Sequence, residues 1–150
     1  MSYSIVICAS FRFYNDVVEL QRKLDEAGFR CEIPVPNEYL DPKRPWKFQE
    51  DLVVPEPKMF QTLWKSIEDH LKRIEDTDIV YVHGGGEGYV GRGVASEMGY
   101  SQGLQLYNPL QRPRLILSSE QLADMTMRGY VEEEIPPDKL ISRLSQTSIS

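Results

Sequence analysis

DIVYVHGGGEGYVGRGVASEMGYSQG, residues 78–103, is the stretch that decides the fold. It begins with the apolar run Ile79–Val82, whose β-branched and aromatic residues predict a buried strand. A helical segment begins at Val94 and carries the carboxylate Glu97 near its first turn. Between them, six glycines fall within ten residues: Gly84, Gly85, Gly86, Gly88, Gly91 and Gly93. A strand, a glycine loop and a helix N-terminus together form a crevice that suits an anionic ligand.

The glycine loop has two interpretations. Glycine carries an entropic cost, so six of them indicate backbone that needs positive φ or lies close to a ligand. The same loop could instead be only a turn, with Glu97 complementing the helix dipole. The dinucleotide pattern G-x-G-x-x-G occurs at residues 86–91, but this strand is the third of the chain, so the pattern is weak. No Gly-Lys-Ser/Thr follows, which excludes a P-loop.

Strands and helices alternate on both sides of this stretch. Ile5–Ala9 and Arg30–Pro34 are predicted strands, joined by a helix from Phe13 to Ala27 that has an apolar stripe. A second amphipathic helix runs over Lys58–Glu75. The pattern predicts an α/β fold: a doubly wound sheet of four to five mostly parallel strands with helices on both faces. The first strand and the strand at Ile79 should be neighbours at the topological switch point.

The remaining segments are less regular. Residues 34–57 contain six prolines, which predicts a long loop without regular elements. That loop is a surface excursion, a flap over the glycine loop or a subunit contact. We expect residues 105–107 to be loop or strand. Further along, we expect a strand at Arg114–Leu117, a helix at Glu120–Arg128 and a last turn at Lys139–Leu144. Residues 1–144 are expected to form one domain and 145–150 a flexible tail.

Bulk composition narrows the function. The net charge is 17 − 23 = −6, which argues against a nucleic-acid surface. No run approaches a membrane span, and the start lacks signal-peptide features, so a cytoplasmic protein is expected. Cys8 and Cys31 fall in predicted strands and are expected to be buried free thiols. Two cysteines and two histidines far apart in sequence provide no metal-ligand spacing.

Residues 4–107 resemble the nucleoside 2-deoxyribosyltransferase-like superfamily. The resemblance lies in Asp78–Val82, in Ser10–Tyr14 after the first strand, and above all in Gly88-Tyr89-Val90-Gly91, followed by Glu97-Met98-Gly99-Tyr100. The superfamily contains deoxyribosyltransferases and deoxynucleoside-monophosphate N-glycosidases. The resemblance implies a flavodoxin-like fold, a homo-oligomer, no metal or redox cofactor, and a small nucleoside or nucleotide as substrate.

The resemblance also implies catalytic roles. Glu97 would be the nucleophile, or the carboxylate that stabilises positive charge at the sugar C1′. The leaving base needs an acid, and the family's aspartate position falls on His70, whereas the adjacent Asp69 should face another direction. The family's strand-one tyrosine and second acidic residue are replaced by Val6 and Gly91. His70 could serve as the acid or be a solvated residue at the helix end.

Other residues could complete the site. His83, at the mouth of its strand, could face the crevice or be an ordinary loop residue. Arg12 and Arg92 could bind a 5′-phosphate with backbone N–H groups, or be solvated. Tyr89 and Trp46 could stack on a base or only pack. The full set of expected substrate-binding residues is Ser10, Phe11, Arg12, Gly85, Gly88, Tyr89, Gly91, Arg92, Gly93 and Trp46.

Three functions fit these residues. The first is cleavage of an N-glycosidic bond in a nucleoside or nucleotide. The second is a phosphoribohydrolase-type reaction, although the P-G-G-x-G-T-x-x-E motif matches poorly because its threonine is missing. The third is a non-catalytic module that binds a nucleotide or an ADP-ribose-like ligand. A second titratable group within reach of Glu97 would favour catalysis.

Overall fold

The computed structural model describes residues 3–108, 110, 113–119 and 122–146. Within this part, five strands form one sheet in the order β2-β1-β5-β6-β7, and each pairing between neighbours is parallel. The strands are β1 (Ser4–Ala9), β2 (Arg30–Glu32), β5 (Ile79–His83), β6 (Leu115–Ser118) and β7 (Glu133–Glu134). Counted within this sheet alone, the order is 2-1-3-4-5, that of flavodoxin-like folds. The α/β, doubly wound prediction is therefore confirmed.

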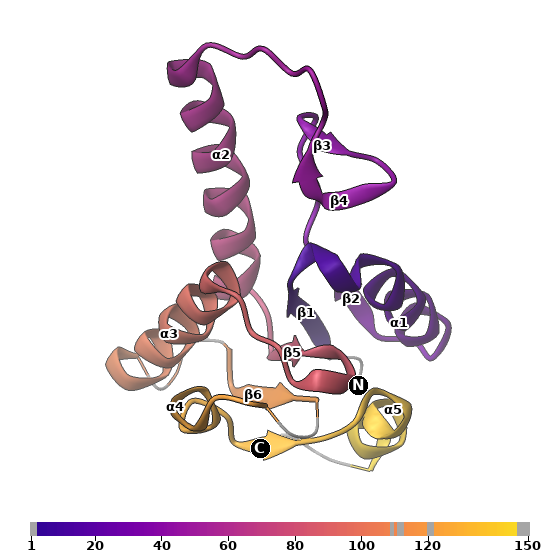
Figure 1. Cartoon of the computed structure of the whole chain (residues 1–150). Coiled ribbons are helices and arrows are strands. Elements are labelled where there is room, and N and C mark those ends of the chain that lie inside the picture. The colour runs from indigo at the N-terminus through magenta and orange to yellow at the C-terminus, as the bar shows by residue number, and fades with distance from the viewer. Residues whose placement is uncertain (1–2, 109, 111–112, 120–121, 147–150) are drawn as a thin grey trace.

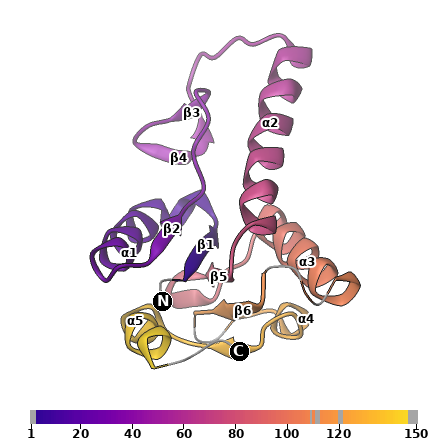
Figure 2. The same cartoon turned by 180° about the vertical axis from the view of Figure 1, so that it is seen from behind.

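Helices cover both faces of the sheet (Figures 1 and 2). On one face lie α1 (Tyr14–Glu26) and α5 (Pro137–Ser145), whose leucines share a core with Ile5, Ile7 and Tyr81. On the other lie α2 (Glu56–Glu75) and α3 (Arg92–Tyr107), with the short α4 (Met125–Arg128) beside them. Helices α1 and α2 are amphipathic, with buried residues toward the sheet, which is why the 3.6-residue periodicity located them.

Strand alternation decides which side chains reach which face. In β1, Ile7 packs with α1 and α5, whereas the next residue, Cys8, packs in the core under α2 and α3. In β5, Tyr81 belongs to the α1 side and Val82 to the α2 side. Because alternate residues of a strand share a face, His83 follows Tyr81 to the α1 side. Cys8 and His83 therefore lie on opposite faces of the sheet.

The proline-rich segment contains a β-hairpin, so the prediction of a loop without regular elements is wrong. Strands β3 (Leu40–Asp41) and β4 (Arg44–Phe48) pair antiparallel as a separate two-stranded sheet. Asp41 stabilises the turn, because its carboxylate accepts hydrogen bonds from the backbone N–H of Lys43 and from Nε of Arg44, both at 2.9 Å. The hairpin stands opposite the first half of α2 (Figure 1), and β4 packs against η1 (Phe11–Phe13).

Other boundaries also differ from the predictions. Residues 105–107 continue helix α3 and are neither loop nor strand. Helix α2 begins at Glu56, with a proline in its first turn, where a missing N–H costs nothing. Of the predicted helix 120–128, the described part is helical only from Met125, and residues 120–121 lie outside the described residues. Residue Ser145 ends α5, and residues 147–150 of the predicted tail lie outside the described part.

The cysteines and the apolar helices can both be compared with what the composition predicted. Cys8 and Cys31 are both buried and free, as predicted. No helix among the described residues is long and apolar enough to cross a membrane.

Candidate functional site

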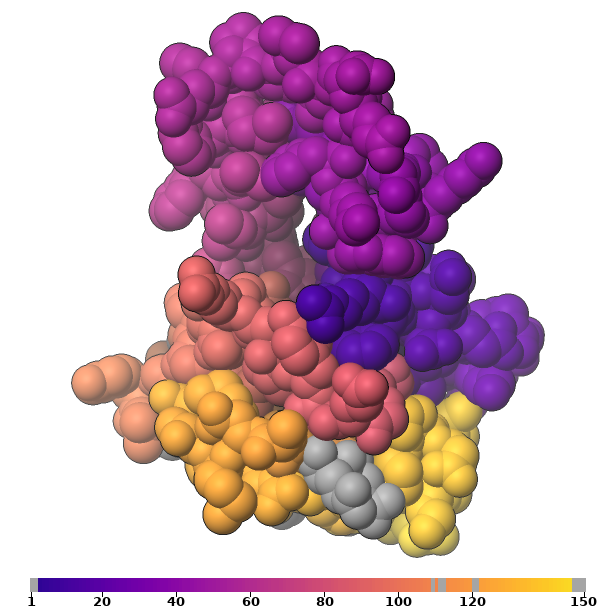
Figure 3. All heavy atoms as spheres, in the orientation of Figure 1, coloured from indigo at the N-terminus to yellow at the C-terminus, as the bar shows by residue number. Residues whose placement is uncertain are grey.

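A cavity of about 520 Å³ opens at the carboxyl end of β1. Its walls come from α2, from the first turns of α3, from the segment 34–37 and from β4. Figure 3 shows the hollow beneath the purple arch that the hairpin and the upper part of α2 form. Its place at the β1–β5 switch point is where doubly wound sheets bind ligands.

Three chemically active side chains meet at the base of this cavity: Cys8 of β1, His70 of α2 and Glu97 of α3. His70 Nε2 lies 3.6 Å from Glu97 Oε2 and 3.6 Å from Cys8 Sγ. His70 and Glu97 line the cavity, and Cys8 lies fully buried behind them.

Helical periodicity explains why His70 points inward. It precedes Ile74 by four residues, so both lie on the face of α2 that packs on the sheet, and His70 is 6% exposed. On α3, Glu97 lies between the buried Val94 and Ser101, at the edge of the covered face. Its side chain is 22% exposed and lines the cavity, although the Oε2 atom itself is buried. His70 is thus not the solvated helix-end residue that the sequence alone also allowed.

The electrostatics of this cluster are unusual for a protein interior. Burial, reinforced by the negative charge of Glu97, holds the pKa of the Cys8 thiol well above its ordinary value. Among the described residues, His70 Nδ1 and Glu97 Oε2 have no hydrogen-bond partner although both atoms are buried. Buried polar atoms without partners are rare in proteins and need an explanation, such as a bound group or a catalytic task.

Seven of the sequence-predicted residues line the cavity together: Glu97, His70, Ser10, Phe11, Trp46, Gly91 and Gly93. Ser10 also caps η1, where its hydroxyl accepts the N–H of Arg12 at 3.3 Å. Gly91 is the N-cap of α3 and provides no side-chain acceptor to the first amides of that helix. An uncapped N-terminus beside a cavity favours an anionic ligand group.

Six predicted residues do not line the cavity: His83, Arg12, Arg92, Tyr89, Gly85 and Gly88. The ring of His83 instead packs edge-on against Phe13, with ring centroids 5.7 Å apart, and burial lowers its pKa. The guanidinium of Arg12 lies 4.4 Å from the ring centroid of Tyr89 as a cation–π pair. Strand alternation accounts for the position of His83, since it faces α1 and not α2.

The glycine loop divides into two functional parts. Gly85 and Gly88 adopt positive φ, at 63° and 66°, and a Cβ on Gly85 would lie 2.5 Å from the ring of Phe13. A Cβ on Gly84 would lie 2.9 Å from the backbone of Gly88. Here glycine is required by a tight turn over Phe13. Only Gly91 of the later loop, with Gly93 in the first turn of α3, borders the cavity.

Sequence reasoning missed several lining residues. Asp69 also lines the cavity, and its carboxylate pairs with Lys65 at 2.8 Å, which lowers the pKa of Asp69. Arg73, one turn further, also lines the cavity and donates to the carbonyl of Ile33 at 3.4 Å. Helical spacing could have found Arg73, because it follows His70 by three residues.

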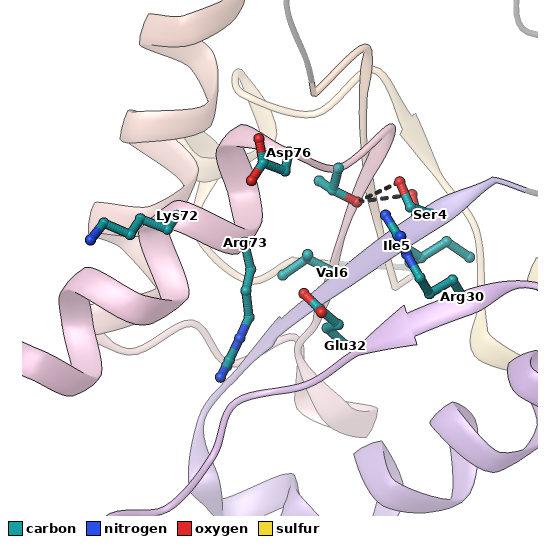
Figure 4. Close-up of a pocket in the computed structure, with 9 residues that line it drawn as sticks. Ser4, Ile5, Val6, Arg30, Glu32, Lys72, Arg73 and Asp76 are labelled. Atoms are coloured by element: carbon teal, nitrogen blue, oxygen red, sulfur yellow. Dashed lines mark hydrogen bonds between the residues drawn. The ribbon is translucent and has the colours of Figure 1, made fainter.

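A smaller pocket of about 290 Å³ lies at the opposite, amino-terminal end of β1. Figure 4 shows Arg73 running past Val6 and Glu32 on one side of it, and Arg30 near Ser4 on the other. Three cationic side chains and two carboxylates line this pocket, and none of the described lining residues has a buried side-chain polar atom without a hydrogen-bond partner, unlike His70 and Glu97 in the larger cavity.

Neither a protein-family model nor a curated protein matches this sequence significantly. Membership of the nucleoside 2-deoxyribosyltransferase-like superfamily therefore stays a prediction from the residues quoted above, whereas the flavodoxin-like fold is observed directly.

Proposed function

We propose that this protein cleaves the N-glycosidic bond of a small nucleoside or nucleotide, by hydrolysis or by transfer of the sugar. The observation that carries the proposal is the Glu97–His70 pair, 3.6 Å apart, at the base of a cavity of about 520 Å³. That volume lies within the range of small-molecule sites. A carboxylate beside a second titratable group is what glycosidic cleavage needs.

The reaction assigns one task to each partner. As the C1′–N bond breaks, its electron pair leaves with the base, which accepts a proton from the His70 imidazolium. Positive charge develops on the sugar, and the carboxylate of Glu97 stabilises it directly or forms a covalent bond to C1′. Water or a second base then attacks C1′, and neutral His70 accepts the proton that the nucleophile loses.

The cavity walls offer matching recognition groups. Trp46 and Phe11 present aromatic surface on which a base can stack. The uncapped start of α3 at Gly91 and the guanidinium of Arg73 provide the positive potential that a 5′-phosphate prefers. These groups take the place of Arg12 and Arg92 in the proposal, and they favour a nucleoside monophosphate over a nucleoside.

Base release from a panel of ribo- and deoxyribonucleosides and their 5′-monophosphates tests the proposal. Glu97→Gln removes the negative charge but keeps the shape of the side chain. Glu87→Gln is the matched control, because Glu87 is exposed and does not line the cavity. Base release that is lost in Glu97→Gln and kept in Glu87→Gln supports glycosidic cleavage. Release that is equal in both variants, or absent throughout, contradicts it.

One observation favours the second candidate, a non-catalytic module that binds a nucleotide or an ADP-ribose-like ligand. Val6 stands at the family's tyrosine position and is buried in the core at 1% exposure, so it cannot contact a substrate. A thermal-shift screen distinguishes the two candidates. A nucleotide that stabilises the protein without losing its base, even at long incubation, would favour the binding module.

We also propose self-association. Helix α2 and the hairpin expose large apolar side chains, among them Phe60 at 60%, Trp64 at 67% and Phe48 at 48%. Apolar groups gathered on one surface often mark a subunit contact. Light scattering after gel filtration should give a mass above 17.3 kDa, and Trp64→Glu should lower it. A monomer mass for the native protein would contradict this proposal.

A further inference from the structure

The Cys8–His70–Glu97 cluster gathers a thiol, an imidazole and a carboxylate at one place in the protein interior. One ligand atom from each of the three side chains, a sulfur, a ring nitrogen and a carboxylate oxygen, lies within 4.8 Å of the other two. The 3.6 Å between His70 Nε2 and Glu97 Oε2 exceeds the 2.7–3.2 Å of an N–H···O hydrogen bond. His70 Nε2 and Cys8 Sγ are within sulfur hydrogen-bonding distance, whereas His70 and Glu97 are at ion-pair distance, too far apart for a hydrogen bond.

The spacing of these atoms also matches that of ligands around one metal ion. Zinc binds sulfur at about 2.3 Å and nitrogen at about 2.0–2.1 Å with tetrahedral angles, which places neighbouring S and N ligands about 3.6 Å apart. The observed separation of Cys8 Sγ and His70 Nε2 is 3.6 Å. The same construction for nitrogen and oxygen ligands predicts about 3.4 Å, close to the 3.6 Å of the His70–Glu97 pair.

We propose that Cys8, His70 and Glu97 form a site for one divalent transition-metal ion of the zinc class. This inference goes beyond the proposed glycosidic cleavage and does not depend on it. Thiolate and imidazole ligands favour zinc, cobalt or copper over magnesium and calcium, which prefer oxygen ligands alone.

Charge balance supports the site in its buried position. A thiolate, a carboxylate and a neutral imidazole together carry two negative charges, which a divalent ion cancels. A net charge of zero avoids the large desolvation cost of an isolated buried charge. On binding, the S–H bond of Cys8 breaks and its proton passes to solvent, so metal affinity should rise with pH.

The arrangement leaves the fourth position accessible. His70 and Glu97 line the cavity, whereas Cys8 lies behind them, 0% exposed. Three protein ligands with the remaining position directed at a cavity are the pattern of catalytic and regulatory zinc sites, and structural sites are closed by four protein ligands. Metal bound to Glu97 would withdraw that carboxylate from the sugar, so it would compete with the proposed reaction.

Cobalt(II) titration of the chelator-treated protein tests the site. We expect one equivalent to bind, with visible bands of tetrahedral Co²⁺ and a sulfur-to-cobalt charge-transfer band in the near ultraviolet. Equimolar Zn²⁺ should abolish both signals. Spectra without a charge-transfer band, or with octahedral bands only, would overturn the proposal.

Two cysteine variants make the assignment specific. Cys8→Ser should abolish the charge-transfer band, whereas Cys31→Ser, which alters the other buried free cysteine in the neighbouring strand β2, should keep it. Glu97→Gln should weaken cobalt binding at least about tenfold. This variant tests the site independently if Cys8→Ser does not fold. A band that survives in Cys8→Ser, or unchanged affinity in folded Glu97→Gln, would refute the site. Because cobalt binding is read without any activity, its outcome is separate from that of the base-release assay.

Discussion

Gly85→Ala should destabilise the protein strongly, although the glycine does not line the cavity. Gly85 has φ of 63°, where a residue with a Cβ costs roughly 1–2 kcal/mol more than glycine. The new Cβ would lie 2.5 Å from Cε1 of Phe13 and force that ring aside, an off-rotamer shift that costs about 1 kcal/mol. The sum is roughly 2–3 kcal/mol, or about 5–10 °C in melting temperature for a chain of this size.

Gly86→Ala is the matched control for this prediction. A Cβ on Gly86 meets nothing within 4 Å, and its φ is not in the left-handed region. Its substitution should leave stability unchanged or raise it by about 0.4–1 kcal/mol, since alanine restricts the unfolded chain. Urea unfolding followed by circular dichroism measures both variants. Equal midpoints for the two would refute the conclusion that Gly85 is required by the turn over Phe13.

Three further predictions concern single side chains. Trp46→Ala should raise KM for a nucleotide about 5- to 150-fold, because one stacking contact is worth about 1–3 kcal/mol. The control Phe48→Ala changes a similarly exposed residue of the same strand and should leave KM unchanged. Equal KM values for the two variants in steady-state kinetics would contradict the stacking role. Burial raises the pKa of the Cys8 thiol, so above the ordinary value of 9.0 the unfolded chain loses this proton first. The free energy of unfolding should therefore fall above that pH by up to about 1.4 kcal/mol per pH unit. Urea titrations should show a shallower fall in Cys8→Ala, and identical slopes for the two proteins would argue against a buried thiol. Burial lowers the pKa of His83, so as pH falls below 6.5 the unfolded state takes up the proton first. In the same urea titrations, acid should lower the free energy of unfolding more in the native protein than in His83→Gln. Parallel pH profiles for the two proteins would contradict a buried neutral imidazole.

The sequence predicted the sheet and its covering helices well because both depend on local periodicity. The stripe of Val17, Leu20 and Leu24 is legible without any tertiary information, and these residues are buried against the sheet as expected. The adjacency of β1 and β5 follows from the rules for parallel crossovers, which need only the order of the elements.

The hairpin at residues 40–48 was not predictable from proline content. Pro42 lies in the turn between β3 and β4, and Pro45 lies in a strand of a two-stranded sheet, which has edges on both sides. Proline is tolerated in both places because no ladder hydrogen bond from its nitrogen is needed there. Counting prolines over a window therefore hid a regular element.

The candidate site shows the same division between local and tertiary information. The sequence alone left open whether His70 is solvated; its spacing of four residues from the buried Ile74 could have placed it on the inward face of α2. The family resemblance had already paired His70 with Glu97, but the presence of Cys8 beside them was not predicted, since it is 62 positions from His70 and lies in another element. No spacing rule covers such a cluster.

The most direct test of the proposed function is base release from nucleoside 5′-monophosphates by the native protein and by Glu97→Gln. If the carboxylate stabilises the developing sugar cation, the variant should lose at least about a hundredfold in kcat while its Kd for the nucleotide changes little. A variant that releases base as fast as the native protein, or a native protein that binds nucleotide and releases none, would contradict the proposed reaction.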